Sequence, residues 1–406
     1  FEQRFQRIAV GESFNAATVF GSGVSNVKVI NSNIASASGT TITAKAFGRT
    51  QVVGTVNGEM SIIELEVRTS SSDVAAPMVA AGAGHTIALR YDGTVWAWGY
   101  NGNGELGQGN TTSVYSPVQV KSADGNSYLT DIIEIAAGSN HNLALDKDGT
   151  VWAWGYNYAG QLGLGDGTNR TTAQQVLGGA SGSQYLTDIV EVKAATWHTL
   201  ALKANGTVYA WGCNSYGQLG DYGTTNSNRP VQVVTGEQGS ASGYLEKVVE
   251  LDATSEADST WGTSIAVTES KKVYGWGYSN YGALGKDGRF TSPIKVSNIN
   301  TAVEAALGGT DSTPFTYILK EDGTVSSLGY NGYGQLGNGT TTSSSTAQDV
   351  KNVTDIVQVS GSQNGYFGAF VKKDGTVWTV GNNGNGQLGN GTAANSSAAQ
   401  DVKNVT

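Results

Sequence analysis

The chain has 406 residues, and its 33 acidic against 24 basic residues give a net charge of −9. This acidic balance argues against nucleic acid as a partner, because binding to a phosphate backbone needs clustered Lys and Arg. No stretch reaches the roughly 18 apolar residues of a membrane span, and the single cysteine, Cys213, excludes an internal disulfide framework.

The first 70 residues carry short alternating runs that are typical of β-strands. The dipeptide Asn57-Gly58 separates two of them and predicts a two-residue hairpin turn. The sequence therefore predicts a small β-sandwich over residues 1–70. The expected strands lie at 27–30, 41–46, 51–56 and 61–67.

Residues 33–46 resemble the bacterial immunoglobulin-like domains of the second group, which serve as spacers and adhesion modules on surface proteins. The resemblance implies an immunoglobulin-like unit, with the start of the chain as a possible truncation. Residues 71–77, of the sequence SSDVAAP, are mostly small and begin with three polar residues, so they are expected to form a linker.

From residue 78 onward the chain repeats itself. A glycine that follows an aromatic or apolar residue recurs at intervals of 56, 57, 65, 52 and 52 residues, and a Leu-Gly pair follows each one in step. Self-similarity at such a period indicates a propeller or a solenoid. The six glycines are Gly99, Gly155, Gly212, Gly277, Gly329 and Gly381.

The second copy shows what one repeat contains. An apolar run at 132–137 is followed by 141–146, by the turn Asp148-Gly149, by Thr150 to Trp154 and by a short run ending at Val176. Asp-Gly between two strand-like runs predicts a type I′ hairpin, with positive φ at both residues. Four antiparallel strands per copy make one propeller blade. Residues 78–406 are therefore expected to be an all-β propeller with six recognisable blades.

The motif DGTVWAWGYN followed by GQLG, with AAG and a histidine before it, resembles the regulator of chromosome condensation repeat family, particularly its bacterial members. Members of that family form β-propellers, commonly with seven blades. Residues 399–406 reproduce 347–354 residue for residue, so a seventh copy would begin where the given sequence stops. The sequence is accordingly expected to be a fragment of a longer polypeptide, with the seventh blade truncated or missing.

The three histidines, His85, His141 and His198, share one position in three neighbouring copies. Later copies place Thr or Phe there, so a local hydrogen-bonding role is favoured over a metal or a catalytic site, unless all three converge near the ring axis. The loop Asp166-Gly167-Thr168-Asn169 offers oxygen ligands for calcium but lacks EF-hand spacing. No cofactor, metal site or catalytic residue is predicted.

The candidate interaction residues are tyrosines and asparagines in the loops that follow the repeated glycines. If they open onto one face, they form an amphipathic ring suited to contact with protein or sugar, whereas packing between blades with the Asn capping a turn is the alternative. The set is Tyr100, Asn101, Tyr156, Asn157, Tyr158, Tyr216, Tyr281, Tyr330, Asn331 and Tyr333.

These observations predict a non-enzymatic binding or scaffold module that is secreted or exposed on a bacterial cell surface. Its expected partner is a protein or another cell-surface component. A sugar-binding propeller and a protein inhibitor of an enzyme, as known for a bacterial member of the family, are the alternatives. A pocket with convergent charged groups would instead favour an enzyme.

Overall fold

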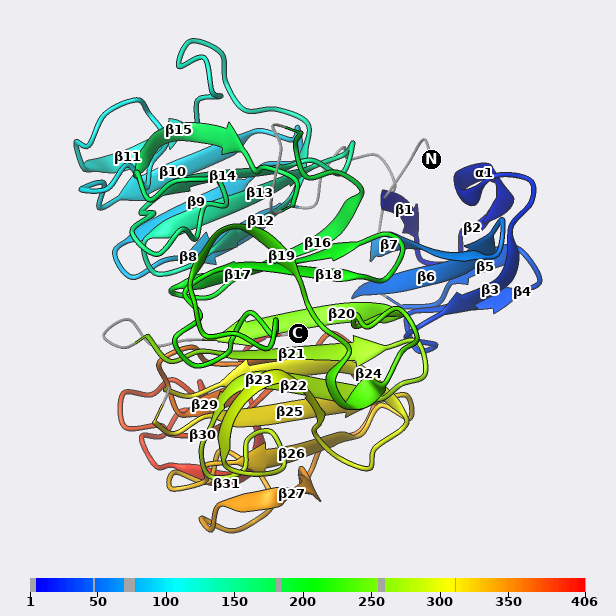
Figure 1. Ribbon diagram of the computed structural model, residues 1–406. Coiled ribbons are helices and arrows are strands. Elements are labelled where there is room, and N and C mark those ends of the chain that lie inside the picture. The colour runs from blue at the N-terminus through cyan, green and yellow to red at the C-terminus, as the bar shows by residue number, and fades with distance from the viewer. Residues whose placement is uncertain are drawn as a thin grey trace.

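The computed structural model describes residues 5–46, 48–68, 77–179, 184–254, 260–310 and 312–405. The chain forms six consecutive four-stranded antiparallel sheets and a smaller N-terminal β unit at one end of them (Figure 1). Most of the predicted linker, residues 71–76, lies outside the described residues. No helix among the described residues is long and apolar enough to span a membrane.

Each sheet is one copy of the repeat, as predicted, and we number the sheets one to six. The first contains β8 (Met78–Ala81), β9 (His85–Leu89), β10 (Val95–Gly99) and β11 (Val114–Gln119), the second β12 (Ile132–Ala137), β13 (His141–Asp146), β14 (Val151–Gly155) and β15 (Arg170–Gln175), and the third β16 (Ile189–Ala194), β17 (His198–Lys203), β18 (Val208–Gly212) and β19 (Ser227–Gln232).

The fourth sheet contains β20 (Val248–Thr254), β21 (Thr263–Thr268), β22 (Val273–Ser279) and β23 (Gly288–Lys295), and a 3₁₀ turn, Gly236–Gln238, precedes it. The fifth contains β24 (Ala302–Gly308), β25 (Phe315–Lys320), β26 (Val325–Gly329) and β27 (Ser344–Asp349), and the sixth β28 (Ile356–Gly361), β29 (Phe367–Lys372), β30 (Val377–Gly381) and β31 (Ser396–Asp401).

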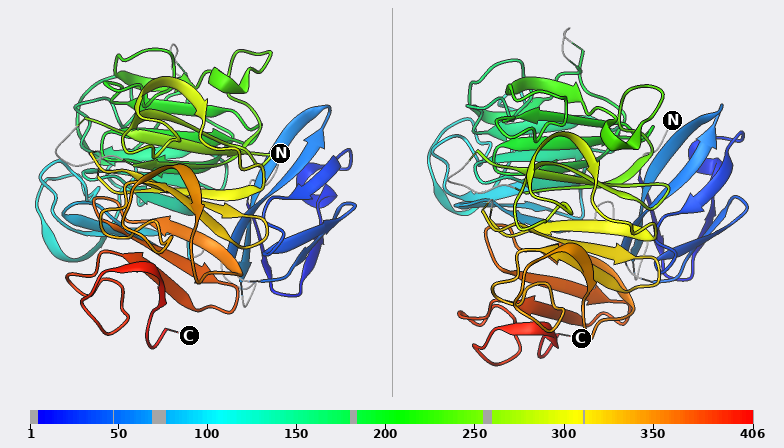
Figure 2. Two further views of the ribbon diagram at one scale, coloured as in Figure 1. Left: turned by 90° about the horizontal axis from the view of Figure 1, so that it is seen from below. Right: turned by 60° about the horizontal axis from the view of Figure 1, so that its bottom comes forward.

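The sheets wind around one axis in chain order, from cyan to red in Figure 2. The first strand of each sheet is the innermost, because β12, β16, β20, β24 and β28 pack on one another in succession. Packing of the same kind is not found between the sixth sheet and the first within the described residues. Six blades around a common axis confirm the predicted β-propeller.

Tryptophans at one repeated position join neighbouring sheets. Trp154, Trp211 and Trp276 are fully buried. Each donates its Nε1 proton at 2.9 Å to a carbonyl in the Leu-Gly loop of the preceding sheet, namely those of Glu105, Gln161 and Gln218. A buried Trp covers about 150–250 Å² and needs a partner for its N–H. At each of these three interfaces the ring therefore fills the space between two sheets, and its N–H is hydrogen-bonded.

The hairpins between the second and third strands are present, but their predicted turn type is wrong. Gly93 and Gly149 have φ near +80°, whereas Asp92 and Asp148 have no positive φ. Gly93 N donates to the Arg90 carbonyl at 3.0 Å, which describes a type I turn followed by a left-handed glycine. In contrast, Asn57-Gly58 in the N-terminal unit has positive φ at both residues and is the type I′ turn that the sequence predicts.

The N-terminal unit consists of two small sheets and one helical turn. Its strands are β1 (Phe5–Ala9), β2 (Ser13–Asn15), β3 (Ser25–Val29), β4 (Ala35–Ser38), β5 (Thr41–Ala44), β6 (Gly48–Val56) and β7 (Glu59–Arg68), with α1 (Ala17–Phe20) after β2. The sheets run β1-β7-β6-β3 and β2-β5-β4. They share a core that includes Ile42 and Ile63.

This unit is docked on one end of the propeller rather than tethered beside it. Val357 of β28 belongs to the core of the unit, and Ile62 of β7 belongs to the core of the propeller. Ile62 N also donates to the Ala204 carbonyl at 2.7 Å, and Lys28 pairs with Glu269 at 2.8 Å. We call the end that it covers the docked end, and the opposite end the loop face.

Candidate functional site

The loop face carries the loops between first and second strands and between third and fourth strands of each sheet. The two loops of one sheet lie side by side, since Tyr156 N donates to the Asn140 carbonyl and Tyr330 N to the Pro314 carbonyl, at 2.8 and 2.9 Å. The N-terminal unit lies at the far end of the strands (Figure 1). The candidate tyrosines therefore do gather on one face.

The three candidate asparagines are not available to a partner. Asn101, Asn157 and Asn331 are fully buried. The Nδ2 of Asn157 donates to the carbonyls of Asp166 and Thr168 at 3.0 Å, and its Oδ1 accepts from Leu162 N at 2.9 Å. The other two make the same contacts in their own loops. The structure thus places them inside the loops, as the alternative of turn capping predicts.

The tyrosines combine packing with exposure. Tyr158 is 80% exposed, Tyr100 50% and Tyr281 42%. Tyr281 contacts Tyr330 with ring centroids 4.9 Å apart, which joins the fourth sheet to the fifth. Rings of neighbouring sheets therefore support one another while leaving one side toward solvent, so both alternatives from the sequence describe part of the arrangement.

Sequence analysis missed four aromatic residues of this face, Trp197, Trp261, Tyr278 and Tyr366. Trp197 packs against Tyr156 at 5.8 Å, and Tyr366 stacks on Tyr333 at 4.7 Å with their planes 16° apart. Trp197 and Tyr366 each precede the first residue of a second strand. A comparison of that position across the six copies would have identified Trp197 and Tyr366.

Each histidine forms a hydrogen bond with a residue of the following sheet. Nε2 of His85 lies 2.7 Å from Asn142 Oδ1, that of His141 3.2 Å from Thr199 Oγ1, and that of His198 3.0 Å from Ser264 Oγ. Burial lowers the pKa of His141 and of His198 to about 3, so both rings are neutral at ordinary pH. This confirms the predicted structural role.

The loop Asp166-Gly167-Thr168-Asn169, which offers oxygen ligands but for which no calcium site is predicted, contains an ion pair. Asp166 Oδ2 accepts from Arg170 Nη2 at 2.7 Å, and its Oδ1 accepts from Thr168 N at 2.8 Å. The guanidinium already neutralises the one carboxylate of this loop. The geometry therefore disfavours calcium at Asp166.

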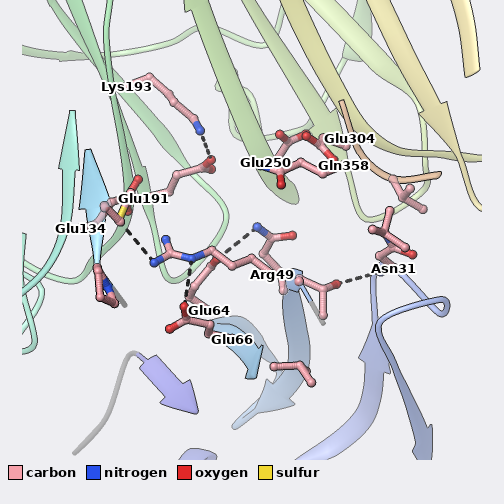
Figure 3. Close-up of a pocket in the computed structure, with 18 residues that line it drawn as sticks. Asn31, Arg49, Glu64, Glu66, Glu134, Glu191, Lys193, Glu250, Glu304 and Gln358 are labelled. Atoms are coloured by element: carbon pink, nitrogen blue, oxygen red, sulfur yellow. Dashed lines mark hydrogen bonds and ion pairs between the residues drawn. The ribbon is translucent and has the colours of Figure 1, made fainter. Parts of the chain in front are cut away.

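A second candidate region, which the sequence analysis did not identify, lies on the propeller axis at the docked end (Figure 3). It is a cavity of about 370 Å³ between the N-terminal unit and the innermost strands. We call it the axial chamber. Its charged lining residues are Arg49, Glu64, Glu66, Glu134, Glu191, Lys193, Glu250 and Glu304.

The four propeller glutamates of the chamber occupy the same position in successive innermost strands. The carboxylate of each reaches the next strand: Glu191 accepts from Leu251 N at 3.1 Å, Glu250 from Ala305 N at 3.0 Å and Glu304 from Val359 N at 3.3 Å. Each innermost strand is the edge of its sheet, so the alternate N–H groups that point away from the second strand face the axis without a ladder partner. The glutamates therefore link the sheets from within.

Positive charge in the chamber is scarce. Lys193 pairs with Glu191 at 3.1 Å, while Arg49 of the N-terminal unit lies 3.9 Å from Glu66. Burial raises the pKa of Glu64 and of Glu304 to about 8, and that of Glu134 to about 7. These carboxyls hold protons near neutral pH because desolvation and like-charged neighbours disfavour their ionised forms.

Perturbed carboxyls in a cavity are also a feature of active sites. Here, however, the glutamates come from four sheets at one repeated position, and Glu191, Glu250 and Glu304 accept hydrogen bonds from the backbone of the next sheet. An asymmetric acid and base assigned to different roles is not evident among the described residues. The repeated runs IIEI, IVEV, VVEL, AVEA and IVQV in the sequence were a signal that could have revealed this ring.

Residues 44–406 match the family model of the RCC1-like domain. Among curated proteins, the ultraviolet-B receptor UVR8 of Arabidopsis thaliana is 31% identical over 318 residues, which cover 77% of this chain and 66% of UVR8. The human E3 ubiquitin-protein ligase HERC2 is 28% identical over 323 residues, 78% of this chain but 6% of HERC2. The chain therefore spans only part of these relatives.

The fold also matches a solved structure, that of Prp20p from Saccharomyces cerevisiae, which was described with its binding properties to Gsp1p and histones. The TM-score is 0.62 at 21% identity, covering 80% of this chain and 76% of that one. At this identity the likeness supports the fold alone. The relatives named here are eukaryotic, so the expected resemblance to bacterial members is supported only at the level of the family.

Proposed function

Because the chain belongs to the RCC1-like domain family, we propose that it is a non-enzymatic protein-binding module and that the loop face is its binding surface. The observation that carries this proposal is the row of aromatic rings on that face, exposed on one side and held by rings of neighbouring sheets on the other. Tyr and Trp give large contact areas at low conformational cost and dominate the energetics of interfaces.

The two ends of the propeller differ in what they offer a partner. At the docked end the N-terminal unit already covers the axis, and the glutamates there bond to backbone N–H groups. On the loop face, Tyr158 and Tyr281 remain exposed on rigid, internally bonded loops. Rigid loops lose little entropy on binding. The binding properties described for Prp20p toward Gsp1p and histones agree with a propeller that binds proteins.

A secreted or bacterial cell-surface location is part of this proposal. Its support is the likeness of residues 33–46 to bacterial immunoglobulin-like domains, which serve as spacers on surface proteins. Fractionation of the source cells, followed by detection with an antibody to this chain, tests it. Signal confined to the cell interior would remove the surface location and leave the binding proposal intact.

Sugar binding is a second candidate because part of the loop face lacks charge. Residues 326–348 and 377–400 contain no Asp, Glu, Lys or Arg, and they are rich in Asn, Ser and Thr. Tyrosine rings beside amide and hydroxyl groups suit a neutral, hydroxyl-bearing ligand. A glycan array that retains the chain would favour this alternative, and an array that retains none would remove it.

Site-directed photo-cross-linking tests the proposed surface. A photoreactive phenylalanine derivative replaces Tyr158 or Tyr281 on the loop face, or Tyr185, which is 52% exposed in the loop between the second and third sheets. Irradiation in extract of the source cells is expected to give one shared cross-linked protein from the first two positions and not from the third. The same product from all three, or from Tyr185 alone, would contradict the proposal.

Affinity measurement completes the test with the captured protein. The double variant Tyr158→Ser with Tyr281→Ser is expected to bind at least about tenfold more weakly, because exposed aromatic anchors dominate interface energies. Tyr185→Ser is the matched control and should bind as the parent chain does. Equal affinity of all three chains would place the interface elsewhere.

A further inference from the structure

The axial chamber lies where the N-terminal unit meets the propeller, and the unit lines it with charged side chains. Arg49 comes from β6, and Glu64 and Glu66 come from β7. These side chains face the innermost strands of the propeller across the cavity of about 370 Å³ (Figure 3). The charges of the two units therefore meet at the centre of the docked end.

The propeller lines the other side of the chamber mainly with carboxyls. Its charged lining residues are Glu134 of β12, Glu191 and Lys193 of β16, Glu250 of β20 and Glu304 of β24. With the two glutamates and one arginine of the N-terminal unit, six carboxyls and two cations surround the chamber. Full ionisation of the carboxyls would therefore leave a large excess of negative charge between the two units.

Each of the two cations has an ion-pair partner in its own unit. Arg49 lies 3.9 Å from Glu66, and Lys193 lies 3.1 Å from Glu191. Arg49 also donates to Met78 Sδ of β8 at 3.4 Å, which is a contact with a neutral group of the propeller. The ion pairs thus neutralise charge within each unit, and they leave Glu64 opposite the propeller glutamates.

The contacts that dock the unit surround the chamber and use neutral groups. The carbonyls of Ala204 and Glu321 accept from Ile62 N at 2.7 Å and from Asn33 Nδ2 at 3.1 Å. Val357 of β28 packs in the core of the unit. Interfaces between domains of one chain resemble transient protein–protein interfaces, so a change of charge in the chamber is large enough to decide whether the unit stays docked.

We propose that the N-terminal unit is a pH-dependent cover of the axial chamber, which leaves the propeller when the chamber glutamates lose their protons. Once ionised, Glu64 and the propeller glutamates repel one another across the chamber, and undocking lets water solvate them. Undocking also exposes Val357 and the innermost strands at the docked end. Because the loop face takes no part, the proposal is independent of the proposed binding function.

The direction of the pH effect follows from the protons bound in the two states. In the docked chain, burial raises the pKa of Glu64 and of Glu304 to about 8 and that of Glu134 to about 7. In the undocked chain water reaches these carboxyls, and their pKa values fall toward 4.5. The docked state therefore binds more protons, and docking weakens as the pH rises from about 6.5 to about 8.5.

Thiol labelling measures undocking. Val357→Cys places a thiol beneath the N-terminal unit, and Val325→Cys places one in the core of the propeller, both in a Cys213→Ser background. Each alkylation rate is divided by the rate of the unfolded chain at the same pH, which removes the effect of thiol ionisation. From pH 6.5 to pH 8.5 the corrected rate at position 357 is expected to rise at least tenfold.

The rate at position 325 reports unfolding of the propeller. At pH 8.5 it is expected to remain at least tenfold below the rate at position 357. Equal rates at the two positions would mean that the whole chain opens, and a rate at position 357 that does not rise with pH would mean that the unit stays docked. Either result overturns the proposal.

A further substitution tests whether the chamber carboxyls cause the release. Glu64→Gln cannot ionise and keeps an oxygen that accepts from Gln51 Nε2. At pH 8.5 it is expected to slow labelling of the Val357→Cys chain at least fivefold. Glu59→Gln, at an exposed position of the same strand, is the matched control and should leave the rate unchanged. Equal rates for both variants would overturn the assignment to the chamber.

Small-angle X-ray scattering provides a test that needs no cysteine substitution. The radius of gyration of the parent chain is expected to increase between pH 6.5 and pH 8.5, and that of Glu64→Gln to increase less. Circular dichroism at both pH values shows whether the strands remain. An unchanged radius of the parent chain, or an increase that is accompanied by loss of the β-sheet signal, overturns the proposal.

Discussion

The docked end and the loop face of the propeller are built from the same repeat but use their side chains in opposite ways. At the docked end, glutamates of successive innermost strands bond to the next strand, and the N-terminal unit covers them. On the loop face, aromatic rings pack against one another and remain partly exposed; Tyr158 is 80% exposed. The difference shows which repeated positions hold the ring together and which are left for a partner.

The comparison has a consequence for mutation. Substitutions at the docked end should change stability, whereas substitutions of exposed rings on the loop face should change binding alone. The buried asparagines of the loop face are the exception, because they belong to the framework of the loops.

Glu191→Ala is expected to destabilise the chain by about 3 kcal/mol. The change leaves Lys193 without its nearest partner and Leu251 N without its acceptor. Chemical denaturation measures the difference in the free energy of unfolding. Glu191→Gln is the control, since it keeps an acceptor for Leu251 N and should cost clearly less. Equal costs for both variants would mean that the charge, and not the link between the sheets, decides the effect.

Asn157→Ala is expected to cost about 2 kcal/mol, because it removes both donors to the carbonyls of Asp166 and Thr168 and the acceptor for Leu162 N. Thermal unfolding followed by circular dichroism detects the loss. Asn385→Ala, at an exposed position of the sixth sheet's loop, should leave the midpoint unchanged. An unaltered midpoint for Asn157→Ala would mean that Asn157 does not stabilise its loop, and it would again be a candidate for contact with a partner.

Stability is expected to fall as the pH rises from about 6.5 to about 8, whereas below about 6.5 the buried neutral rings of His141 and His198, whose pKa burial lowers to about 3, oppose the effect of the chamber carboxyls. The folded state raises the pKa of Glu64 from 4.5 to about 8 because burial disfavours the carboxylate. In this window the folded chain binds more protons than the unfolded chain, so the free energy of unfolding decreases with pH. The neighbouring groups that contribute are Arg49, Glu134, Glu191 and Lys193.

Glu64→Gln should reduce this pH dependence and stabilise the chain at pH 8 by about 1 kcal/mol, since each pKa unit corresponds to about 1.4 kcal/mol and relaxation lessens the effect. Denaturation midpoints at pH 5.5 and pH 8 for parent and variant measure it. An unchanged pH dependence in the variant would show that Glu64 is already ionised in the folded chain over this range. Glu59→Gln, in the same strand but away from the chamber lining, serves as the control.

Tyr158→Ala should change the free energy of unfolding by less than about 0.5 kcal/mol, because most of its ring is in water. Differential scanning calorimetry of the variant beside Tyr317→Phe gives the contrast. Tyr317 is fully buried and donates its hydroxyl proton to the Gln335 carbonyl, so loss of that group should cost more. A large loss at Tyr158 would mean that the loop-face rings mainly hold the fold.

The repeat made the propeller predictable from the sequence. Six glycines in register and the Asp-Gly hairpins located the strands, and identical runs around the tryptophans indicated identical packing. The turn type was wrong because Asp-Gly also suits a type I turn with a left-handed glycine, and the strand twist selects between the two turns. Among the Asp-Gly and Asn-Gly dipeptides of the described residues, Asn57-Gly58 alone has positive φ at both residues.

The candidate site was less predictable because the sequence of one repeat does not show which residues of neighbouring sheets lie close together. Tyr156 and Trp197 are 41 positions apart, yet their rings touch. Asn157 looked like a surface amide beside Tyr156, but its loop folds back over it. The axial chamber is lined by residues of two units of the chain, Arg49 and Glu64 from the N-terminal unit and Glu191 from the propeller. No local sequence pattern predicts how these two units dock.

Hydroxyl-radical footprinting of the chain, with and without the protein captured by cross-linking, tests the difference between the two ends most directly. The account predicts that the partner protects Tyr158, Tyr281 and Tyr333 from oxidation. Tyr128, Tyr185 and Tyr244, which lie in the loops that lead from one sheet to the next, should keep their rates. Protection of these three, with unchanged oxidation of the loop face, would contradict it.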